Sequence, residues 1–149
     1  MTHPTIALFT GDPAGIGSEL VQKLLNHSTS QQAAKIILIG QKDSVQAPPN
    51  VSWHAWSGFN ATPFPKGTYD AHNGAYMIAA LAEGVSLVRD GKAHAFCFAP
   101  LNKSALRMGG MHKKMNYAGL QISSITKACA GNSMCCKTYG PPESLRMFP

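Results

Sequence analysis

The N-terminal third of the chain contains the pattern that most constrains its fold: an apolar run, a glycine-rich segment, a helical pattern and a second apolar run. The apolar runs span residues 5–10 and 35–39, and they enclose glycines at 11–17 and helically spaced leucines at 20–25. Continuous apolar runs are typical of parallel strands buried on both faces. The pattern predicts a β–α–β unit and an α/β fold with a parallel-rich sheet and flanking helices.

The predicted helix after the glycines has apolar residues at helical spacing, namely Leu20, Val21, Leu24 and Leu25. Asp12 or Ser18 could cap its N-terminus. Glu19 suits the positive end of the helix dipole.

In the remainder of the first 112 residues, predicted strands and helices also alternate. Residues 47–67 are rich in Pro and Gly and predict a connecting region with one short strand. A helix is predicted over 70–89, and a third strand over 93–98. A short helix that ends near Gly109 follows. The helix over 70–89 is predicted from apolar positions that follow a helical period: Ala71, Ala75, Ile78, Ala79, Ala82, Val85 and Val88.

Charge and cysteine are distributed unevenly along the 149 residues. Residues 1–102 hold six basic and six acidic side chains, whereas residues 103–149 hold seven basic side chains, one acid and three of the four cysteines. We therefore divide the chain into residues 1–112, a partial α/β lobe, and residues 113–149, a basic tail of different character. The length suffices for one domain and is too short for two full α/β domains.

Location and cysteine chemistry follow from what the sequence lacks. No apolar stretch approaches the length of a membrane span, and residues 1–4 do not resemble a signal peptide. We expect a cytoplasmic protein with reduced thiols that does not bind a membrane.

Two loops are candidate binding elements because each follows a predicted strand. The glycines at 11–17 can expose backbone N–H groups at a helix N-terminus, where anions dock. The turn at 99–104 carries Lys103, whose ammonium group could meet a phosphate or a carboxylate. A simpler interpretation exists for each loop: the glycine segment could be a tight connection that binds no ligand, and Lys103 could be an ordinary solvated lysine. Residue spacing alone does not decide between binding and these simpler interpretations.

Several other kinds of site are not supported by the spacing. The glycines match neither the dinucleotide fingerprint nor the P-loop, and no nucleophile elbow is present. The six histidines show no paired metal-ligand spacing, so a metal site built from this chain alone is not expected. The basic tail has few aromatics and no recognised module, so nucleic acid is not the expected partner.

Two strings carry a resemblance to a known family. Residues 11–19 read Gly-Asp-Pro-Ala-Gly-Ile-Gly-Ser-Glu, and residues 99–106 read Ala-Pro-Leu-Asn-Lys-Ser-Ala-Leu, followed by Gly109 and Gly110. Both resemble motifs of the 4-hydroxythreonine-4-phosphate dehydrogenase family of pyridoxal phosphate biosynthesis, and the resemblance covers residues 5–112. It implies the N-terminal portion of a two-lobed fold like that of isocitrate and isopropylmalate dehydrogenases, acting as a homodimer.

The resemblance also implies a chemistry. Family members oxidise a secondary alcohol with NAD or NADP, with decarboxylation in the family type, and a divalent metal polarises the hydroxyl group. Relatives oxidise other hydroxy acids or cis-dihydrodiols. The substrate is then a phosphorylated or carboxylated small molecule. The residues expected to line its cleft are Asp12, Gly15, Lys103 and His112.

The chain departs from the family after its glycine pair. Where the family carries a His-Thr-Glu motif, this chain has Asn116, Tyr117 and Ala118, and the family's three metal histidines have no counterpart in residues 113–149. Family members are also more than twice as long. We therefore expect this chain to be inactive by itself and to bind neither cofactor nor metal.

A frameshift would explain the departure. With suitable codons, a shift of two nucleotides from Lys113 rereads the chain as EDELRWFAD, an amphipathic helix, and rereads residues 131–149 as EFNVLQNLWTSRVTSHVP. The end of the second string resembles the family segment with its first metal histidine. We expect residues 113–149 to be a non-native tail.

Two alternatives from other classes stay open. The first is a small non-enzymatic α/β module in which the glycine loop and Lys103 hold an anion. Such a module would be stabilised by its ligand without turning over a cofactor. The second is a nucleic-acid binder that uses the basic tail, whose affinity would collapse with salt.

Overall fold

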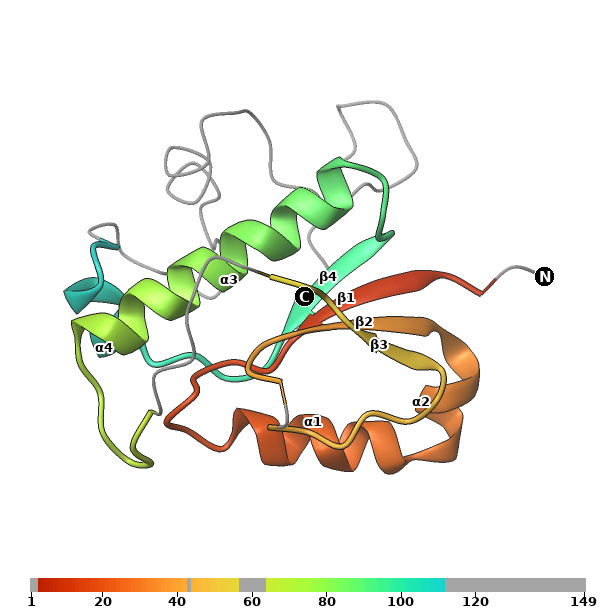
Figure 1. Cartoon of the computed structure of the whole chain (residues 1–149), viewed down its shortest axis with the longest axis horizontal. Coiled ribbons are helices and arrows are strands. Elements are labelled where there is room, and N and C mark those ends of the chain that lie inside the picture. Colours follow the sequence, from red (N-terminus) through yellow and green to blue (C-terminus); the bar gives the residue numbers. More distant parts are fainter. Residues whose placement is uncertain (1–2, 43, 57–63, 112–149) are drawn as a thin grey trace, which may run out of the picture.

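The computed structural model of the chain describes residues 3–42, 44–56 and 64–111. His112 and the proposed tail at 113–149 lie outside the described residues. The described part contains four strands and four helices (Figure 1), in the order β1 (Thr5–Phe9), α1 (Gly17–Asn26), α2 (Ser28–Ala33), β2 (Lys35–Ile39), β3 (Val51–Trp53), α3 (Ala71–Arg89), β4 (Ala95–Phe98) and α4 (Lys103–Met108).

The four strands form one sheet in the order β3-β2-β1-β4, and every neighbouring pair is parallel. The chain leaves β1 towards β2 and β3, then crosses back to place β4 on the other side of β1. The direction in which successive strands are added to the sheet therefore reverses at β1, between β2 on one side and β4 on the other. The parallel pairing of all neighbouring strands confirms the predicted α/β sheet, and the reversal creates a position where ligands bind in folds of this kind.

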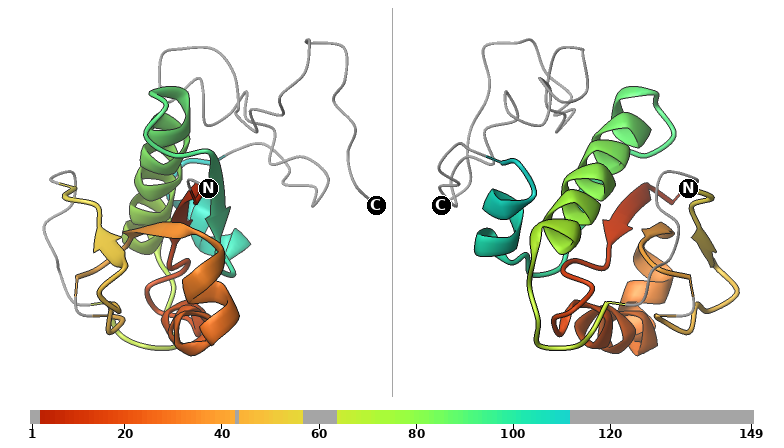
Figure 2. Two further views of the ribbon diagram at one scale, coloured as in Figure 1. Left: turned by 90° about the vertical axis from the view of Figure 1, so that its right-hand side faces the viewer. Right: turned by 60° about the vertical axis from the view of Figure 1, so that its left-hand side comes forward.

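Side chains of successive strand residues point to opposite faces, and each face has its own core. Ala7 and Phe9 of β1 pack in the cluster that contains α3 and α4, whereas Leu8 packs with Val21 and Leu25 of α1. Figure 2 shows the resulting three layers, with α1 and α2 on one face of the sheet and α3 and α4 on the other.

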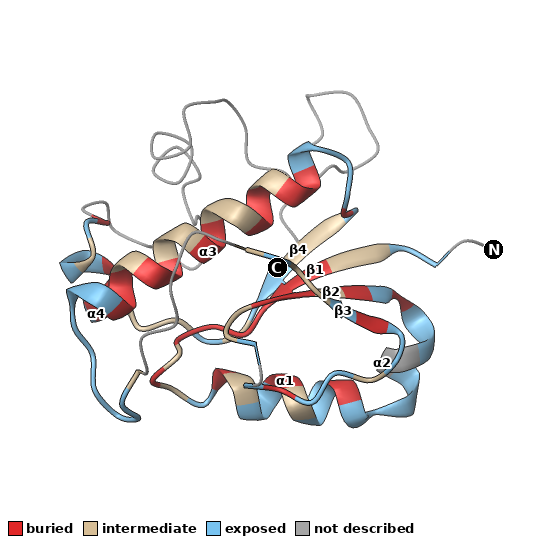
Figure 3. Cartoon of the chain, viewed as in Figure 1, coloured by how far each residue is buried: buried red, intermediate tan, exposed pale blue. Residues whose placement is uncertain are grey.

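The predicted strands and the three predicted helices are confirmed, but the buried face of α1 is narrower than predicted. Val21 and Leu25 are buried, whereas Leu20 and Leu24 are 41% and 45% exposed. The outward side of α1 is accordingly exposed in Figure 3. Helix α2, which the sequence analysis missed, has the polar sequence STSQQA and therefore gives no hydrophobic period.

Helix α3 is confirmed, but its periodic apolar positions are not its most buried ones. Only Val85 and Val88 among them are buried, Ala71 is exposed and the others are partly buried, whereas residues on most of the helix circumference are covered. The reason is close packing at glycines: a Cβ on Gly74 would overlap the backbone of Ala105, and one on Gly84 would overlap the ring of Phe96. Within the described residues no helix is both long and apolar enough to cross a membrane.

Candidate functional site

The loops that follow β1 and β4 are joined by a hydrogen bond. The backbone N–H of Asp12 donates to the carbonyl oxygen of Pro100 over 3.0 Å. Gly11 permits this approach, since its φ is +83° and a Cβ there would lie 2.6 Å from the same oxygen. The two predicted binding loops therefore meet where the order of the strands reverses.

Asp12 shapes the glycine loop. Its carboxylate Oδ1 accepts a hydrogen bond from the Ala14 N–H at 2.9 Å, and its carbonyl oxygen accepts one from the Gly15 N–H at 3.1 Å. Asp12 is only 8% exposed, so these bonds fix a buried turn. The prediction that Asp12 or Ser18 caps α1 is wrong: the N-cap is Ile16, and no side chain caps the helix. The carboxylate instead closes the loop before the helix begins.

A second segment holds the glycine loop from outside. The Lys66 ammonium donates to the carbonyl oxygen of Gly15 at 2.8 Å, and the Gly67 N–H donates to that of Ala14 at 2.9 Å. Because Gly67 has a φ of +76°, glycine is favoured in this turn. Gly15, a predicted site residue, is thus held between Asp12 and Lys66 through its backbone alone.

Lys103 is the first residue of α4 and is partly buried. The preceding residue, Asn102, caps the helix by accepting hydrogen bonds from the N–H groups of Ser104 and Ala105. Helix α4 is in turn locked on α3, because a Cβ on Gly109 would overlap Gly74. Lys103 therefore follows the Asp12–Pro100 junction on a fixed backbone.

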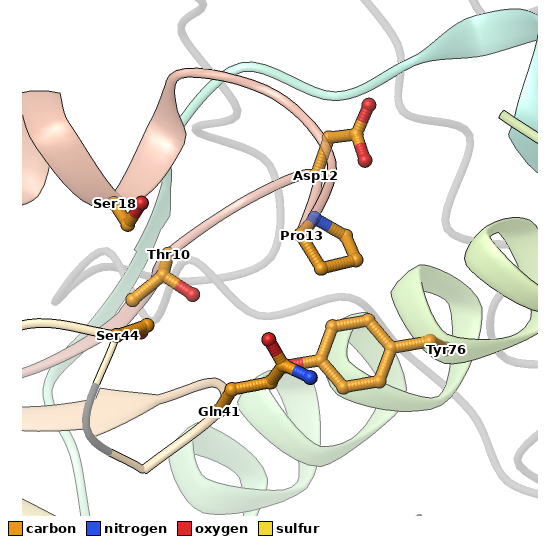
Figure 4. Close-up of a pocket in the computed structure, with 7 residues that line it drawn as sticks. All are labelled: Thr10, Asp12, Pro13, Ser18, Gln41, Ser44 and Tyr76. Carbon is orange, nitrogen blue, oxygen red and sulfur yellow. The ribbon is translucent and has the colours of Figure 1, made fainter. Parts of the chain in front are cut away.

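A small hollow lies on the other side of β1, between the loops that follow β1 and β2. It is open to solvent, and its cavity volume of about 10 Å³ is room for about one water molecule. Of the predicted site residues only Asp12 lines it, and Figure 4 shows the Asp12 carboxylate turned away from Gln41 and Tyr76. The lining residues are Thr10, Asp12, Pro13, Ser18, Gln41, Ser44 and Tyr76.

Tyr76 joins the hollow to an aromatic cluster. Its ring lies 5.0 Å from that of Phe64, 5.4 Å from that of Trp56 and 6.1 Å from that of Phe9, between ring centroids. Burial raises the pKa of the Tyr76 phenol above its ordinary value, and a hydrogen bond with the backbone of Gln41 partly opposes the rise. The phenol therefore remains neutral and acts as an uncharged wall of the hollow.

Metal-ligating side chains do not gather in the described part of the chain. No group of three or more His, Cys, Asp or Glu side chains is placed to hold a metal ion there. His54 instead pairs with Glu83, with 2.6 Å between Nε2 and Oε1, and ties the end of β3 to α3. His112, the fourth predicted site residue, lies outside the described residues.

Sequence reasoning missed Lys66 and most residues of the hollow. Thr10 and Gln41 carried a signal, because both follow the ends of predicted neighbouring strands, whose carboxyl ends meet at one edge. Tyr76 carried none, since an aromatic residue within a helix indicates core packing first.

Comparison with known proteins places these features in a family. The model of the family described as "Pyridoxal phosphate biosynthetic protein PdxA" matches residues 7–131. A Pasteurella multocida protein, provisionally described as a 4-hydroxythreonine-4-phosphate dehydrogenase, is 33% identical over 136 residues, covering 74% of this chain and 40% of its own length. A D-threonate 4-phosphate dehydrogenase of Cupriavidus necator is 30% identical over 132 residues, covering 74% and 39%.

The fold is shared with solved structures. A crystal structure of a 4-hydroxythreonine-4-phosphate dehydrogenase from Burkholderia phymatum superposes with a TM-score of 0.71 at 22% identity, over 89% of this chain and 46% of that one. This chain spans about 40% of the length of the curated relatives it matches. The family match covers most of the residues, including both loops, and the chain belongs to the PdxA family.

Proposed function

We propose that residues 3–111 form the N-terminal part of a nicotinamide-dependent dehydrogenase that oxidises a phosphorylated hydroxy acid. The proposal rests on the Asp12–Pro100 hydrogen bond, which brings the two family motifs together where the strand order reverses. The names of the relatives support the substrate class, since they specify 4-hydroxythreonine 4-phosphate and D-threonate 4-phosphate. Residues 1–112 would then be one part of a substrate cleft that a family-length chain completes.

Within this proposal, the residues of this chain bind and orient the substrate. Lys103, on the capped start of α4, would pair its ammonium with a phosphate or carboxylate group. Asp12 would hold the glycine loop, so that the backbone around Gly15 lies at a constant distance from the substrate. His112 would be a fourth binding residue. None of these groups accepts a hydride, so they position the substrate rather than oxidise it.

The cofactors of the proposal do not fit the described residues alone. A nicotinamide dinucleotide, NAD or NADP, would accept the hydride. The glycine loop lacks the dinucleotide fingerprint, and the described residues offer no cluster of three metal ligands. We therefore derive no step through the cofactor or a divalent metal, and we propose that this chain by itself is inactive.

A chimaera tests the function. Residues 1–112 would replace the matching segment of the Pasteurella multocida relative. Reduction of NAD and NADP would be followed by absorbance with each of the two phosphorylated acids and a divalent metal. The parent relative is the positive control, and residues 1–149 alone are expected to show no turnover. A folded chimaera without turnover, beside an active parent, would refute the proposal.

The tail is a separate proposal. We propose that residues 113–149 arise from a changed reading frame, which accounts for their charge and cysteine content. The family match extends to residue 131, 19 residues into this segment, so the coding DNA should be sequenced across codons 105–149 and beyond to find where any change of frame occurs. Another frame that continues into a long, histidine-containing family sequence is the expected result, and the lack of any such frame would make the tail genuine.

Assembly and location follow from the same proposal. We propose that the family-length protein is a homodimer in the cytoplasm. Light scattering of the chimaera would give its mass, and fractionation of cells that express it would give its location. A monomeric chimaera that turns over substrate would contradict the dimer.

A further inference from the structure

Helix α1 carries three large apolar side chains that no part of the described structure buries. Ile16, the N-cap residue, is 59% exposed, and Leu20 and Leu24 are each more than 40% exposed. The three residues are spaced four apart, so they form one row along the helix, here called the α1 row. Single exposed leucines are common on protein surfaces, whereas a continuous apolar row indicates a contact with another element.

The α1 row lies on the side of the helix that is turned towards β4. The other side carries Gln22, whose amide donates to the Gln46 carbonyl oxygen over 3.2 Å and accepts from the Gln46 N–H over 2.6 Å. Because Gln46 follows β2, these bonds mark the β2 side of α1. With about 3.6 residues per turn, Gln22 and the α1 row lie on opposite flanks of the buried Val21 and Leu25. The α1 row therefore borders the β4 side of the sheet.

Strand β4 is uncovered on the same face of the sheet. Cys97 is the register partner of Leu8, whose side chain packs against α1, so Cys97 also points to the α1 face. Cys97 is nevertheless exposed. A Cβ on Gly17 would lie 3.3 Å from the Cβ of Ala99, so the start of α1 lies against the end of β4. The α1 row and Cys97 therefore border one uncovered strip of the surface.

The crossovers of this sheet do not account for that strip. Helix α1 belongs to the crossover from β1 to β2, whereas α3 and α4 pack on the opposite face, as Figure 2 shows. Parallel crossovers are almost always right-handed, so a further strand beyond β4 would bring its helix to the face of α3. The α1 face of β4 is left for a segment that returns to the sheet from elsewhere.

We propose that a helix from the remainder of a family-length chain packs between the α1 row and β4. More than half of each curated relative's length lies outside its match with this chain, so enough sequence exists to supply that helix. A second copy is a poorer occupant, because a stable dimer buries about 800 Å² per partner and three part-exposed side chains supply only a fraction of that area. Segments of one chain need less area, since they are already joined.

The charges beside the α1 row specify the chemistry of this helix. Glu19 and Lys23 are exposed on the solvent side of the row, and neither forms an ion pair within the described residues. The occupant should therefore have an apolar face bordered by a basic residue near Glu19 and an acidic residue near Lys23. The proposal depends on membership of the family and not on dehydrogenase activity.

Labelling of Cys97 with iodoacetamide tests the proposal, because its thiol lies within the proposed contact. The 149-residue chain is compared with the chimaera described above, without substrate or cofactor, and peptide mass spectrometry reports the reaction of this cysteine alone. Cys97 should react at least about 10-fold more slowly in the chimaera, since a covered thiol reacts only when the covering segment opens. Ser52→Cys, at an exposed position on β3 at the other edge of the sheet, is the matched control and should react at similar rates in both proteins.

The same rates identify the occupant. Slow reaction of Cys97 in the 149-residue chain at low concentration would mean that this chain covers the surface by itself, and slowing only at high concentration would mean that a second copy does. Either result would overturn the proposal, as would equal rates in the chain and the chimaera. Because labelling needs no turnover, a folded but inactive chimaera leaves the proposal intact.

A second measurement uses the 149-residue chain alone and does not depend on the folding of the chimaera. The dye anilinonaphthalene sulfonate, which fluoresces on apolar surface, should bind the wild type, and the pair Leu20→Asn and Leu24→Asn should lower the signal about two-fold. His27→Asn, at an exposed position just after α1, is the control and should retain the signal. A signal that the pair leaves unchanged would overturn the proposal, because the α1 row would then not be accessible apolar surface.

Discussion

The backbone N–H of Asp12 and the carbonyl oxygen of Pro100 lie 3.0 Å apart and join two loops that are almost ninety residues apart in the chain. The bond lies beside β1 and β4, at the point where the strand order reverses. The loop after β1 is bonded to Pro100 and also to Lys66, so it can keep one shape when a ligand binds. A preformed loop lowers the entropic cost of binding.

The glycines of the first loop should differ sharply in their tolerance of a side chain. A Cβ on Gly17 would overlap the carbonyl oxygen of Thr10, whereas one on Gly15 would make ordinary contacts with Asp12 at 3.4–3.5 Å. We expect Gly17→Ala to lower the free energy of unfolding by about 2–4 kcal/mol and Gly15→Ala to change it by less than about 1 kcal/mol. Urea denaturation measures both, and equal losses would contradict the close approach.

The Asp12 side chain should stabilise the turn because its oxygen accepts a hydrogen bond, and not because the carboxylate is charged. Asp12→Ala removes the acceptor of the Ala14 N–H and should cost about 1–2 kcal/mol of unfolding free energy, whereas Asp12→Asn keeps an oxygen in place and should cost less. Chemical denaturation of the three proteins checks the order. If the Asn variant is the less stable of the two, the charge and not the acceptor holds the loop.

The burial of Tyr76 should make the folded protein less stable in alkaline solution. Its pKa is raised in the folded state, so its contribution to stability is complete below the unfolded-state value of about 10 and is lost as the pH rises above it. The free energy of unfolding should therefore fall above about pH 10, and Tyr76→Phe should remove part of that fall. Tyr69→Phe, at an exposed tyrosine, is the control and should retain it.

The pair of His54 and Glu83 should show a small but measurable coupling. Their side chains are 19% and 34% exposed and 2.6 Å apart, so solvent screens the interaction only partly. A double-mutant cycle with alanine at both positions should give about 0.5–1 kcal/mol. The more exposed pair of Arg89 and Asp90, 3.3 Å apart, serves as the comparison and should couple less. Equal coupling energies would mean that burial does not strengthen the His54 pair.

Much of this fold could be predicted because its strands and helices are determined by patterns of neighbouring residues in the sequence. Apolar runs indicated the strands, and the glycine segment with the helical period of Val21 and Leu25 indicated the first crossover. The meeting of the loops at Asp12 and Pro100 followed from parallel strands, whose carboxyl ends share an edge. What helical periodicity missed was tertiary packing: Gly74 and Gly84 are buried because α4 and Phe96 approach them closely.

The hollow could not be predicted in the same way. Its walls come from three separate segments, and the phenol of Tyr76 reaches it from the middle of the chain. Residue spacing contains no information on which side of β1 such a space opens. Lys66 was likewise hidden, since its contact with Gly15 depends on the path of a connecting segment 51 residues away.

The role of Lys103 is tested most directly by turnover of the chimaera that carries Lys103→Met, compared with one that carries Lys92→Met. Lys103 begins α4 beside the loop junction, whereas Lys92 is exposed in the turn after α3. We expect the first substitution to lower kcat/KM for the phosphorylated acid by about 100-fold, near 2.7 kcal/mol, and the second to have little effect. Equal activity of both variants, with intact folds, would contradict the assignment of Lys103 to the substrate cleft.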